Sequence, residues 1–323
     1  MSTITPDPAA PDAIERHGIR LGDVLFKGVA LVAAAGVAAV LVFLTYKVFA
    51  LAWPAIDKYG LSFIWTQGWN PNSNVYGALV FIYGTVVTAF IALLLATPLS
   101  VAIALFLTEL APKRLAAPIA TMVELLAAIP SVVLGLWGIL VFGPWVANHL
   151  EPWLTNWFGF LPIFSGSPSQ AGVLPAALVL TIMIIPITSA ICRELFSRVP
   201  RDLSDGSLAL GSTRWEAIRR VAIPYAAPGI SAAVLLGLGR AFGEAIAVTQ
   251  VIGSGNHINR SLFPPGDTLA SRIASTYQGA ANQLEVQSLL YLGAILLVIS
   301  LITNVSAQAI VNRFQKARRM STG

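Results

Sequence analysis

The sequence has 323 residues, of which 56% are hydrophobic and only 11% are charged, and its mean hydropathy is +0.75. A soluble domain carries about 25% charged residues, so this composition excludes an ordinary soluble protein and indicates an integral membrane protein built from helices. The net charge of +5 comes from Lys and Arg residues that flank apolar runs, with no basic, aromatic-rich patch that would favour nucleic acid. The single cysteine, Cys192, excludes an internal disulfide and a cysteine metal cluster.

Apolar runs along the chain predict an all-α membrane protein with six transmembrane helices, each needing about 20 residues to cross a bilayer. The first 25 residues are Pro- and Ala-rich without the charged start of a signal peptide, so we expect a disordered cytoplasmic tail. The stretch 143–171 contains Trp, Pro and Gly but no Lys or Arg, and we expect a loop there. The spans are expected at 26–53, about 77–107, 116–142, 173–191, 226–252 and 289–309.

The distribution of basic residues predicts the orientation of these spans. Segments on one side of the predicted membrane hold 15 of the 20 Lys and Arg residues, whereas segments on the other side hold four. Cytoplasmic segments carry the excess of Lys and Arg in membrane proteins. The sequence therefore predicts that both termini are cytoplasmic, and that the hydrophilic segment 193–225 is a cytoplasmic loop.

The fifth predicted span carries two charged residues near its middle, Arg240 and Glu244. A charge at that depth costs at least about 2.5–3.5 kcal/mol on insertion scales. The spacing of four residues places both side chains on one face of a continuous helix, and Gly237, Gly239 and Gly243 leave that face open to close approach. Because the Arg fork matches phosphate or carboxylate oxygens, one interpretation is an oxyanion site. The alternative is a self-neutralising ion pair that only permits insertion.

Two hydroxyl residues inside predicted spans, Ser131 and Thr249, are candidates for hydrogen bonding to a substrate. The alternative is that each hydroxyl donates back to a carbonyl of its own helix. Glu124, in the third predicted span, either pairs with an arginine at the cytosolic end or is buried in its protonated form. Glu109 is expected to lie at the membrane interface.

The cytoplasmic loop carries signals for two short helices joined at a glycine. Pro200 suits the first turn of the first helix, and Gly211 suits the left-handed residue that follows a helix end. Thr213 and Glu216 have the spacing of a capping box for the second helix, which Pro224 is expected to stop. The sequence thus predicts a rigid elbow between the fourth and fifth spans, although an ordinary helical hairpin would show the same signals.

This elbow resembles the coupling loop of ABC-importer permeases through Ala209, Gly211 and the pair Ile223-Pro224. The chain departs from the usual acid-Ala-Ala start, because Asp205-Gly206-Ser207 stands there. The resemblance implies that the loop docks on a cytosolic ATPase. No phosphate-binding G-x-x-x-x-G-K-[ST] motif occurs in the chain, so ATP-Mg would be used by a partner, and this chain needs no cofactor and is not an enzyme. The implied coupling residues are Asp205, Ala209, Gly211, Glu216 and Pro224.

Three further stretches closely resemble the PstC-type permease subunit of phosphate importers, within the binding-protein-dependent (CysTW-like) permeases: 124–131, 239–253 and 261–271. The resemblance covers roughly 75–315. It implies a MetI-like, type I importer permease domain at 77–312, in the bacterial inner membrane, with Arg240 and Glu244 serving phosphate translocation. The implied partners are a PstA-type second permease, two PstB-type ATPases, a PstS-type phosphate-binding protein and membrane lipid, without nucleic acid.

Other functions remain open at this point. Sulfate permeases carry a similar Arg/Glu run, so the anion could be sulfate or molybdate. An ATP-independent secondary transporter or channel would use Arg240 and Glu244 as a proton relay but would leave the Gly211 elbow unexplained. A membrane scaffold or sensor would keep the charged pair for structure alone.

Overall fold

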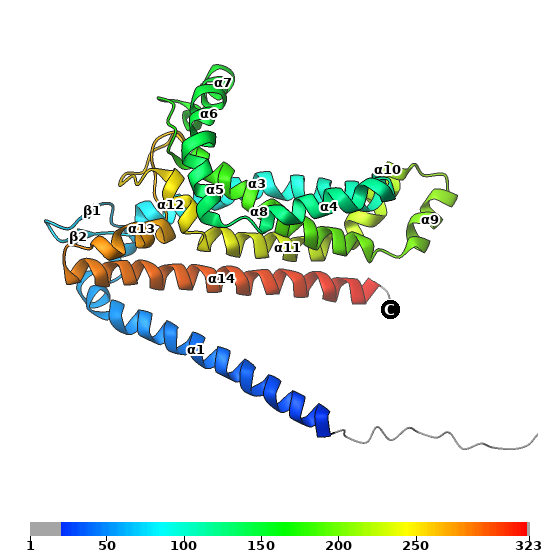
Figure 1. Ribbon diagram of the computed structural model, residues 1–323, viewed down its shortest axis with the longest axis horizontal. Helices are drawn as coiled ribbons and strands as arrows, with labels where there is room; N and C mark the ends of the chain where they lie inside the picture. Colours follow the sequence, from blue (N-terminus) through cyan, green and yellow to red (C-terminus); the bar gives the residue numbers. More distant parts are fainter. Residues whose placement is uncertain (1–20, 322–323) are drawn as a thin grey trace, which may run out of the picture. The chain divides into compact units, whose positions relative to one another are not determined.

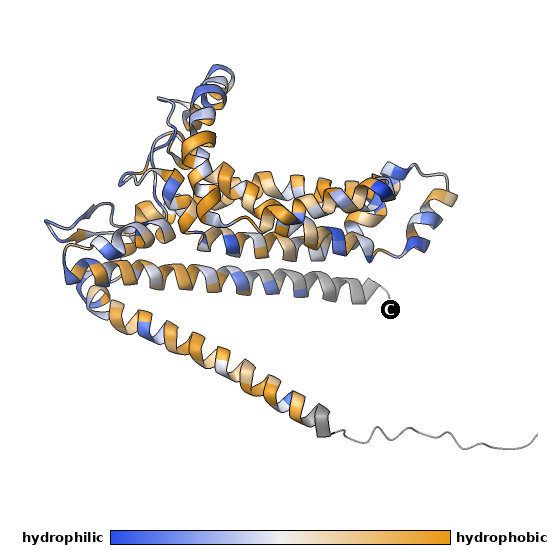
Figure 2. Ribbon diagram, viewed as in Figure 1, coloured by the Kyte–Doolittle hydropathy of each residue, from blue (hydrophilic) through white to orange (hydrophobic). Residues whose placement is uncertain are grey.

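The computed structural model describes residues 21–321, most of which lie in helices (Figure 1). Within these residues, six helical runs are long and apolar enough to cross a membrane, as predicted, and their apolar residues dominate Figure 2. The strands among the described residues are β1 (Trp69–Asn70) and β2 (Val75–Tyr76), which pair antiparallel in a small hairpin. The six runs are 25–59, 79–110, 131–158, 173–197, 214–243 and 283–306.

The chain divides into two structural units after Lys47, so the boundary between the units falls inside helix α1 (Leu21–Tyr59). Residues 25–47 form an apolar helix whose side chains are almost all exposed. From Val48 onward the helix is part of the larger unit, where Ala52 and Ala55 are fully buried. The helix runs through Pro54 and is longer than the predicted 26–53, and most of the predicted tail, 1–20, lies outside the described residues.

The larger unit is organised around α3 (Leu79–Leu105) and α8 (Val173–Ser197), which pack along their lengths. Small residues of α3, including Ala92 and Ala96, let Leu180 and Ile184 of α8 approach closely and form a buried cluster. Each contact between atoms of the two helices contributes little dispersion energy. The many contacts along α3 and α8 together stabilise the pair. A π-turn, Phe106–Leu110, extends α3 beyond this core.

The third predicted span is wrong as drawn, because the helix breaks at 128–130. Helix α4 (Lys113–Ala127) ends there, and a new helical run begins at Ser131 and continues to Phe158. Pro130 lacks an N–H and disfavours helical conformation in the residue before it, which explains the break. The predicted loop 143–171 is therefore helical over its first half. In Figure 1 this run turns steeply away from α4, which packs against α8. Its parts are α5 (Ser131–Trp137), a π-turn at 138–142, α6 (Gly143–Trp145), a π-turn at 146–150 and α7 (Glu151–Phe158).

The fifth predicted span differs at both ends. Helix α10 (Arg214–Ala217) passes through a π-turn, Ile218–Ala222, directly into α11 (Ile223–Gly243), so Pro224 does not stop the helix. The widened turn before Pro224 takes up the hydrogen bond that proline cannot donate. The helix instead ends at Gly243, and a separate short helix, α12 (Ile246–Ile252), follows.

The remaining elements close the two ends of the bundle. At one end, which we call the elbow end, α9 (Arg201–Ala209) and α10 form the predicted elbow. At the opposite end, α2 (Ser62–Trp65), a short turn at Pro162–Phe164, the β hairpin, the loop 253–268 and α13 (Leu269–Thr276) lie together (Figure 1). A turn at Tyr277–Gly279 leads into α14 (Gln283–Ser321), which packs along α11.

Candidate functional site

Arg240 and Glu244 lie on opposite sides of a helix break. Arg240 is in the last turn of α11, whereas Glu244 has extended backbone angles (φ −75°, ψ 107°) and precedes α12. Its Oε1 accepts a hydrogen bond from the backbone N–H of Ala247 at 3.4 Å. No ion pair joins the two residues in the described part of the chain. The expectation that both side chains share one face of a continuous helix is therefore wrong.

The break has a local cause in the sequence around Gly243. Glycine is among the weakest helix formers, and Gly243 is exposed with no packing that would hold it helical. The first N–H groups of a new helix need acceptors, and the Glu244 carboxylate supplies one for α12. Glu244 thus caps α12 and does not neutralise Arg240.

Arg240 occupies the open face of α11. On the other faces, Gly237 packs closely against Ile184 and Thr188 of α8, and Ala241 and Phe242 are buried. Leu236 and Gly243, one turn before and after Arg240, are both exposed. The guanidinium thus stands on an accessible helix face without a carboxylate partner among the described residues, which is the state that an oxyanion-binding arginine requires.

The predicted hydroxyl donors differ in availability. Thr249 donates to the carbonyl oxygen of Ala245 at 2.6 Å, so its hydroxyl bonds back to its own helix, as the alternative interpretation holds. Ser131 is the first residue of α5, half-buried, and its hydroxyl has no hydrogen-bond partner within residues 21–321. Gln250 was not predicted as a site residue: its buried Oε1 has no hydrogen-bond partner among the described residues and lies where Gly135 of α5 leaves room for it.

The elbow has the predicted local structure. Pro200 precedes the first helical residue of α9, and Gly211 is left-handed with φ +89°. The Thr213 hydroxyl accepts from the backbone N–H of Glu216 at 3.3 Å, and the Glu216 carboxylate accepts from the N–H of Thr213 at 2.9 Å. This reciprocal capping box confirms the spacing argument.

The outer surface of the elbow is unusually apolar. Leu210 is 91% exposed and Trp215 is 61% exposed, on either side of Gly211. Asp205 and Ala209 are also exposed. Large apolar side chains grouped on an otherwise polar surface mark a protein interaction site.

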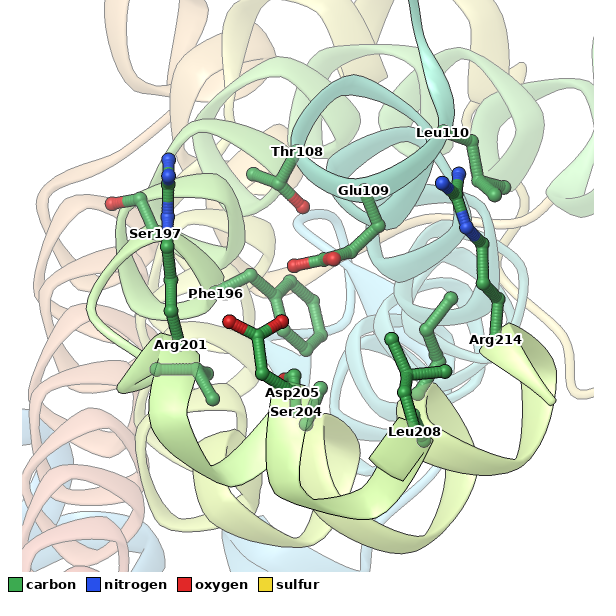
Figure 3. Close-up of a pocket in the computed structure, with 14 residues that line it drawn as sticks. Thr108, Glu109, Leu110, Phe196, Ser197, Arg201, Ser204, Asp205, Leu208 and Arg214 are labelled. Carbon is green, nitrogen blue, oxygen red and sulfur yellow. The ribbon is translucent and has the colours of Figure 1, made fainter. Parts of the chain in front are cut away.

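A cavity of about 640 Å³ separates the elbow from the rest of the bundle (Figure 3). One wall is the π-turn that follows α3, with Thr108 and Glu109, and the end of α8, with Phe196 and Ser197. The facing wall belongs to the elbow and carries Arg201, Asp205 and Arg214 among other residues. Glu109 was predicted only to lie at the membrane interface, because no local pattern relates it to residues 90 or more positions away in the sequence.

An ion pair beside this cavity resolves the role of Glu124. Arg193 of α8 donates to the Glu124 carboxylate of α4, and both side chains are partly exposed. Pairing with an arginine was one of the two predicted alternatives. The contact ties α4 to α8 next to the elbow end.

A buried charged cluster lies at the opposite end of the bundle. Asp267 is 1% exposed and its Oδ2 is 2.9 Å from Nε of Arg272, although the N–H is not aligned for a hydrogen bond. Arg272 also donates to Asn256, and its guanidinium carbon is 4.8 Å from the ring centre of Phe81. Burial raises the pKa of Asp267, and Arg272 and the hydrogen bonds from Ser271 and Thr268 oppose this shift. Burial lowers the pKa of Arg272, and the negative charges of Asp267 and Glu285 oppose this shift.

The contacts of Asp267 and Arg272 fix the loop 253–268 in place. Leu174 and Val173 at the start of α8 donate backbone hydrogen bonds to carbonyls of this loop. The cluster therefore anchors the loop that covers the helix ends at this end of the bundle, and local sequence patterns gave no sign of it.

Comparison with known families decides what the chain is. It matches the family described as "Binding-protein-dependent transport system inner membrane component" over residues 97–316, more than half of its length. The chain belongs to this family. The matched region includes the elbow, α11, α12 and the charged cluster, so every feature described above from Glu109 onward lies in the part that the family shares.

Similar proteins agree with membership in this transport family. A phosphate transport system permease protein PstC from Pasteurella multocida (strain Pm70) is 43% identical over 269 residues, covering 82% of this chain and 84% of the relative. A protein of the same name from Xylella fastidiosa (strain Temecula1) is 40% identical over 323 residues and 98% of both chains. The chain is thus related to transport components and not to enzymes.

A solved structure supports the fold. A chain of a bacterial alginate ABC transporter, crystallised with an alginate-bound periplasmic protein, matches with a TM-score of 0.59 at 16% identity. The match covers 90% of this chain and 96% of the other. The helical architecture is therefore that of an ABC-importer permease.

Proposed function

We propose that the chain is the permease subunit of an ATP-driven phosphate importer in a bacterial inner membrane, with both termini in the cytoplasm. The relatives named as phosphate permeases support the substrate, and the excess of basic residues at the elbow side supports the orientation. The partners would be a second, homologous permease, two copies of an ATPase that uses ATP-Mg, and an extracytoplasmic phosphate-binding protein. The chain itself would need no cofactor.

The observation that carries the mechanism is the unbroken helical path from the elbow to Arg240. Residues 214–243 form one run of 30 residues, which corresponds to about 45 Å at 1.5 Å per residue. The exposed Leu210 and Trp215 would dock on the ATPase at the start of this run. A displacement of α10 by ATPase closure would first bend this run at the π-turn Ile218–Ala222 and then displace α11, which would shift Arg240 between the two sides of the membrane.

Arg240 would bind the anion directly. Its guanidinium has no carboxylate partner within the described residues, and its neighbour Gly239 and the nearby Gly243 leave space beside it. Two parallel N–H donors suit the oxygens of phosphate. Ser131 would offer its hydroxyl to the anion. Glu244 and Thr249 would not contact the anion, but would stabilise the start of α12 next to the break in the helix.

The test is phosphate uptake by the complete complex in proteoliposomes. We expect uptake to require ATP and the ATPase, and Arg240→Ala to reduce it by about tenfold to a hundredfold, because a charge-assisted hydrogen bond contributes about 1.5–3 kcal/mol. Arg240→Lys keeps the charge but loses the fork, so we expect an intermediate loss. Arg114→Ala, which removes an exposed arginine at the start of α4, is the control.

Uptake that persists without ATP would contradict the importer proposal and favour a secondary transporter. Sulfate and molybdate uptake, measured in the same vesicles, tests the anion. Normal transport by an assembled Arg240→Ala variant would remove Arg240 from the proposed site.

A further inference from the structure

The cavity beneath the elbow lies between α9 and α10 on one side and the ends of α3 and α8 on the other. Within the elbow, the N–H groups of Gly211 and Ser212 donate to carbonyls of α9, and the Ser212 hydroxyl donates to the Ser207 carbonyl at 2.5 Å. On the bundle side, the cavity-lining Phe196 is buried in a cluster of residues from α3, α8, the π-turn Ile218–Ala222 and α11. Space of about 640 Å³ lies between the elbow and the bundle. A relative movement of elbow and bundle would therefore change the size of this cavity.

The walls of the cavity carry opposite charges that are not paired. In Figure 3 the Glu109 carboxylate points into the cavity from the bundle wall, toward the carboxylate of Asp205. The guanidinium groups of Arg201 and Arg214 stand on opposite sides of Glu109. None of the four side chains forms an ion pair within the described residues, although Arg201 and Asp205 have the spacing for one on α9.

Neighbouring charges at the same end behave differently. Arg193 forms an ion pair with Glu124, and Arg198 forms one with Glu194; the four side chains are partly or largely exposed. The charges around the cavity are thus unpaired among the described residues, although other charges at this end form pairs. Like charges that face each other across a narrowing cavity repel, so closure would favour a cation between Glu109 and Asp205.

The elbow has a place at which it can pivot. The π-turn Ile218–Ala222 joins α10 to α11, and such widened turns occur frequently at functional positions in helices. Rotation at this turn would carry Arg201 and Arg214 with the elbow, whereas Glu109 stays on the bundle. Narrowing the cavity also removes water from between the charges, which strengthens their attraction.

We propose that Glu109 is a coupling residue that receives an arginine of the elbow, Arg201 or Arg214, when the cavity closes during transport. The ion pair exists in the closed position only, so it stabilises that position relative to the open one described above. This inference rests on the proposed function, because the closing movement is the one that the ATPase would drive.

The first test compares transport with ATP hydrolysis in the complete complex. We expect Glu109→Gln to lower the amount of phosphate imported per ATP hydrolysed by about fivefold or more. Fivefold is at the lower end of the effect that one site typically has on another through a coupling free energy. Glu194→Gln, which removes an exposed carboxylate from the same end, is the matched control and is expected to match the wild type. Equal coupling ratios in Glu109→Gln, Glu194→Gln and the wild type would overturn the proposal.

Charge reversal identifies the partner. Glu109→Arg alone is expected to uncouple transport, and combining it with Arg201→Glu or with Arg214→Glu is expected to restore coupling for the true partner only. A purely structural role of Glu109 would not be rescued in this selective way. Failure of both combinations to restore coupling contradicts the assigned ion pair.

A disulfide cross-link reports the movement without measuring transport. The chain has one cysteine, the buried Cys192, so Cys192→Ala gives a cysteine-free background. In this background we expect Glu109→Cys with Arg201→Cys, or with Arg214→Cys, to cross-link more than fivefold faster when ATP is trapped by an inactive ATPase than without nucleotide. A rate independent of nucleotide would show that the cavity does not close.

The two proposals fail in different ways. A wild-type complex that hydrolyses ATP but imports no phosphate would contradict the phosphate importer, and the cross-link would still report on Glu109. A complex that imports phosphate with ATP, but whose Glu109 variants are fully coupled, would leave the importer intact and remove the coupling role.

Discussion

Arg240 and Glu244 are four residues apart in sequence, yet the helix that contains Arg240 ends at Gly243, and Glu244 lies in the break before the next helix begins at Ile246. The carboxylate of Glu244 accepts the backbone N–H of Ala247, and the guanidinium of Arg240 has no carboxylate partner in the described chain. The arginine is therefore held on an open helix face by the packing of α11 and not by a neighbouring charge. This arrangement leaves its hydrogen-bond donors available for an anion.

This relationship predicts a mild effect of removing the charge of Glu244. In Glu244→Gln the amide oxygen still accepts from Ala247, so we expect normal expression and complex assembly, with stability within about 0.5 kcal/mol of the wild type. Glu244→Leu, which removes the acceptor, should cost about 1 kcal/mol as other lost helix caps do. Thermal stability of the purified complex measures both. Loss of assembly in Glu244→Gln would show that the charge of Glu244 neutralises Arg240 in the membrane.

Local features of the fold were predictable from the sequence. Gly211 and the Thr213–Glu216 capping box depend on backbone sterics and on hydrogen bonds between residues three apart, so their pattern is visible in a few letters. The existence of six apolar runs follows equally from composition.

Helix breaks and long-range sites were less predictable. Pro224 was expected to end a helix, but a π-turn absorbs the missing N–H, whereas Pro130 breaks one and Gly243 ends another. Which outcome occurs depends on tertiary packing. The position of Glu109 opposite Arg201 and Arg214, and the contact of Arg272 with the Phe81 ring, join segments whose pairing no local pattern encodes.

Two glycines of the elbow are expected to respond in opposite ways to the same substitution. A Cβ would meet nothing within 4 Å at either Gly206 or Gly211, so space is not the difference. Gly211 has φ +89°, so Gly211→Ala should cost about 1–2 kcal/mol. Gly206 is inside α9, where Gly206→Ala should gain up to about 1 kcal/mol of helix stability. Hydrogen exchange of the elbow amides in the complex compares the two; equal protection in both variants would contradict the expectation.

The buried ion pair predicts a large loss from a small change. Asp267→Asn leaves Arg272 buried without its carboxylate, and breaking such a pair costs about 3–5 kcal/mol. Asp57→Asn, an exposed aspartate on α1, is the control and should change stability by less than about 0.5 kcal/mol. Equilibrium unfolding in mixed SDS micelles measures the difference. A similar, small effect in both variants would mean that the 253–268 loop does not depend on this pair.

The contact between α3 and the loop 253–268 predicts a site where even one methyl group is not tolerated. A Cβ at Gly84 would lie 1.9 Å from the backbone carbonyl oxygen of Asp267, which has no rotamer to escape into. Gly84→Ala should therefore cost about 1–3 kcal/mol or more, because the whole loop has to shift. At Gly293 in α14 the nearest side-chain atoms would be at 3.8 Å, an ordinary contact, and Gly293→Ala should be neutral or stabilising by up to about 1 kcal/mol. The melting temperatures of the two variants test this contrast. Equal melting temperatures would show that the loop yields to the methyl group, and that the close approach at Gly84 does not hold the loop in place.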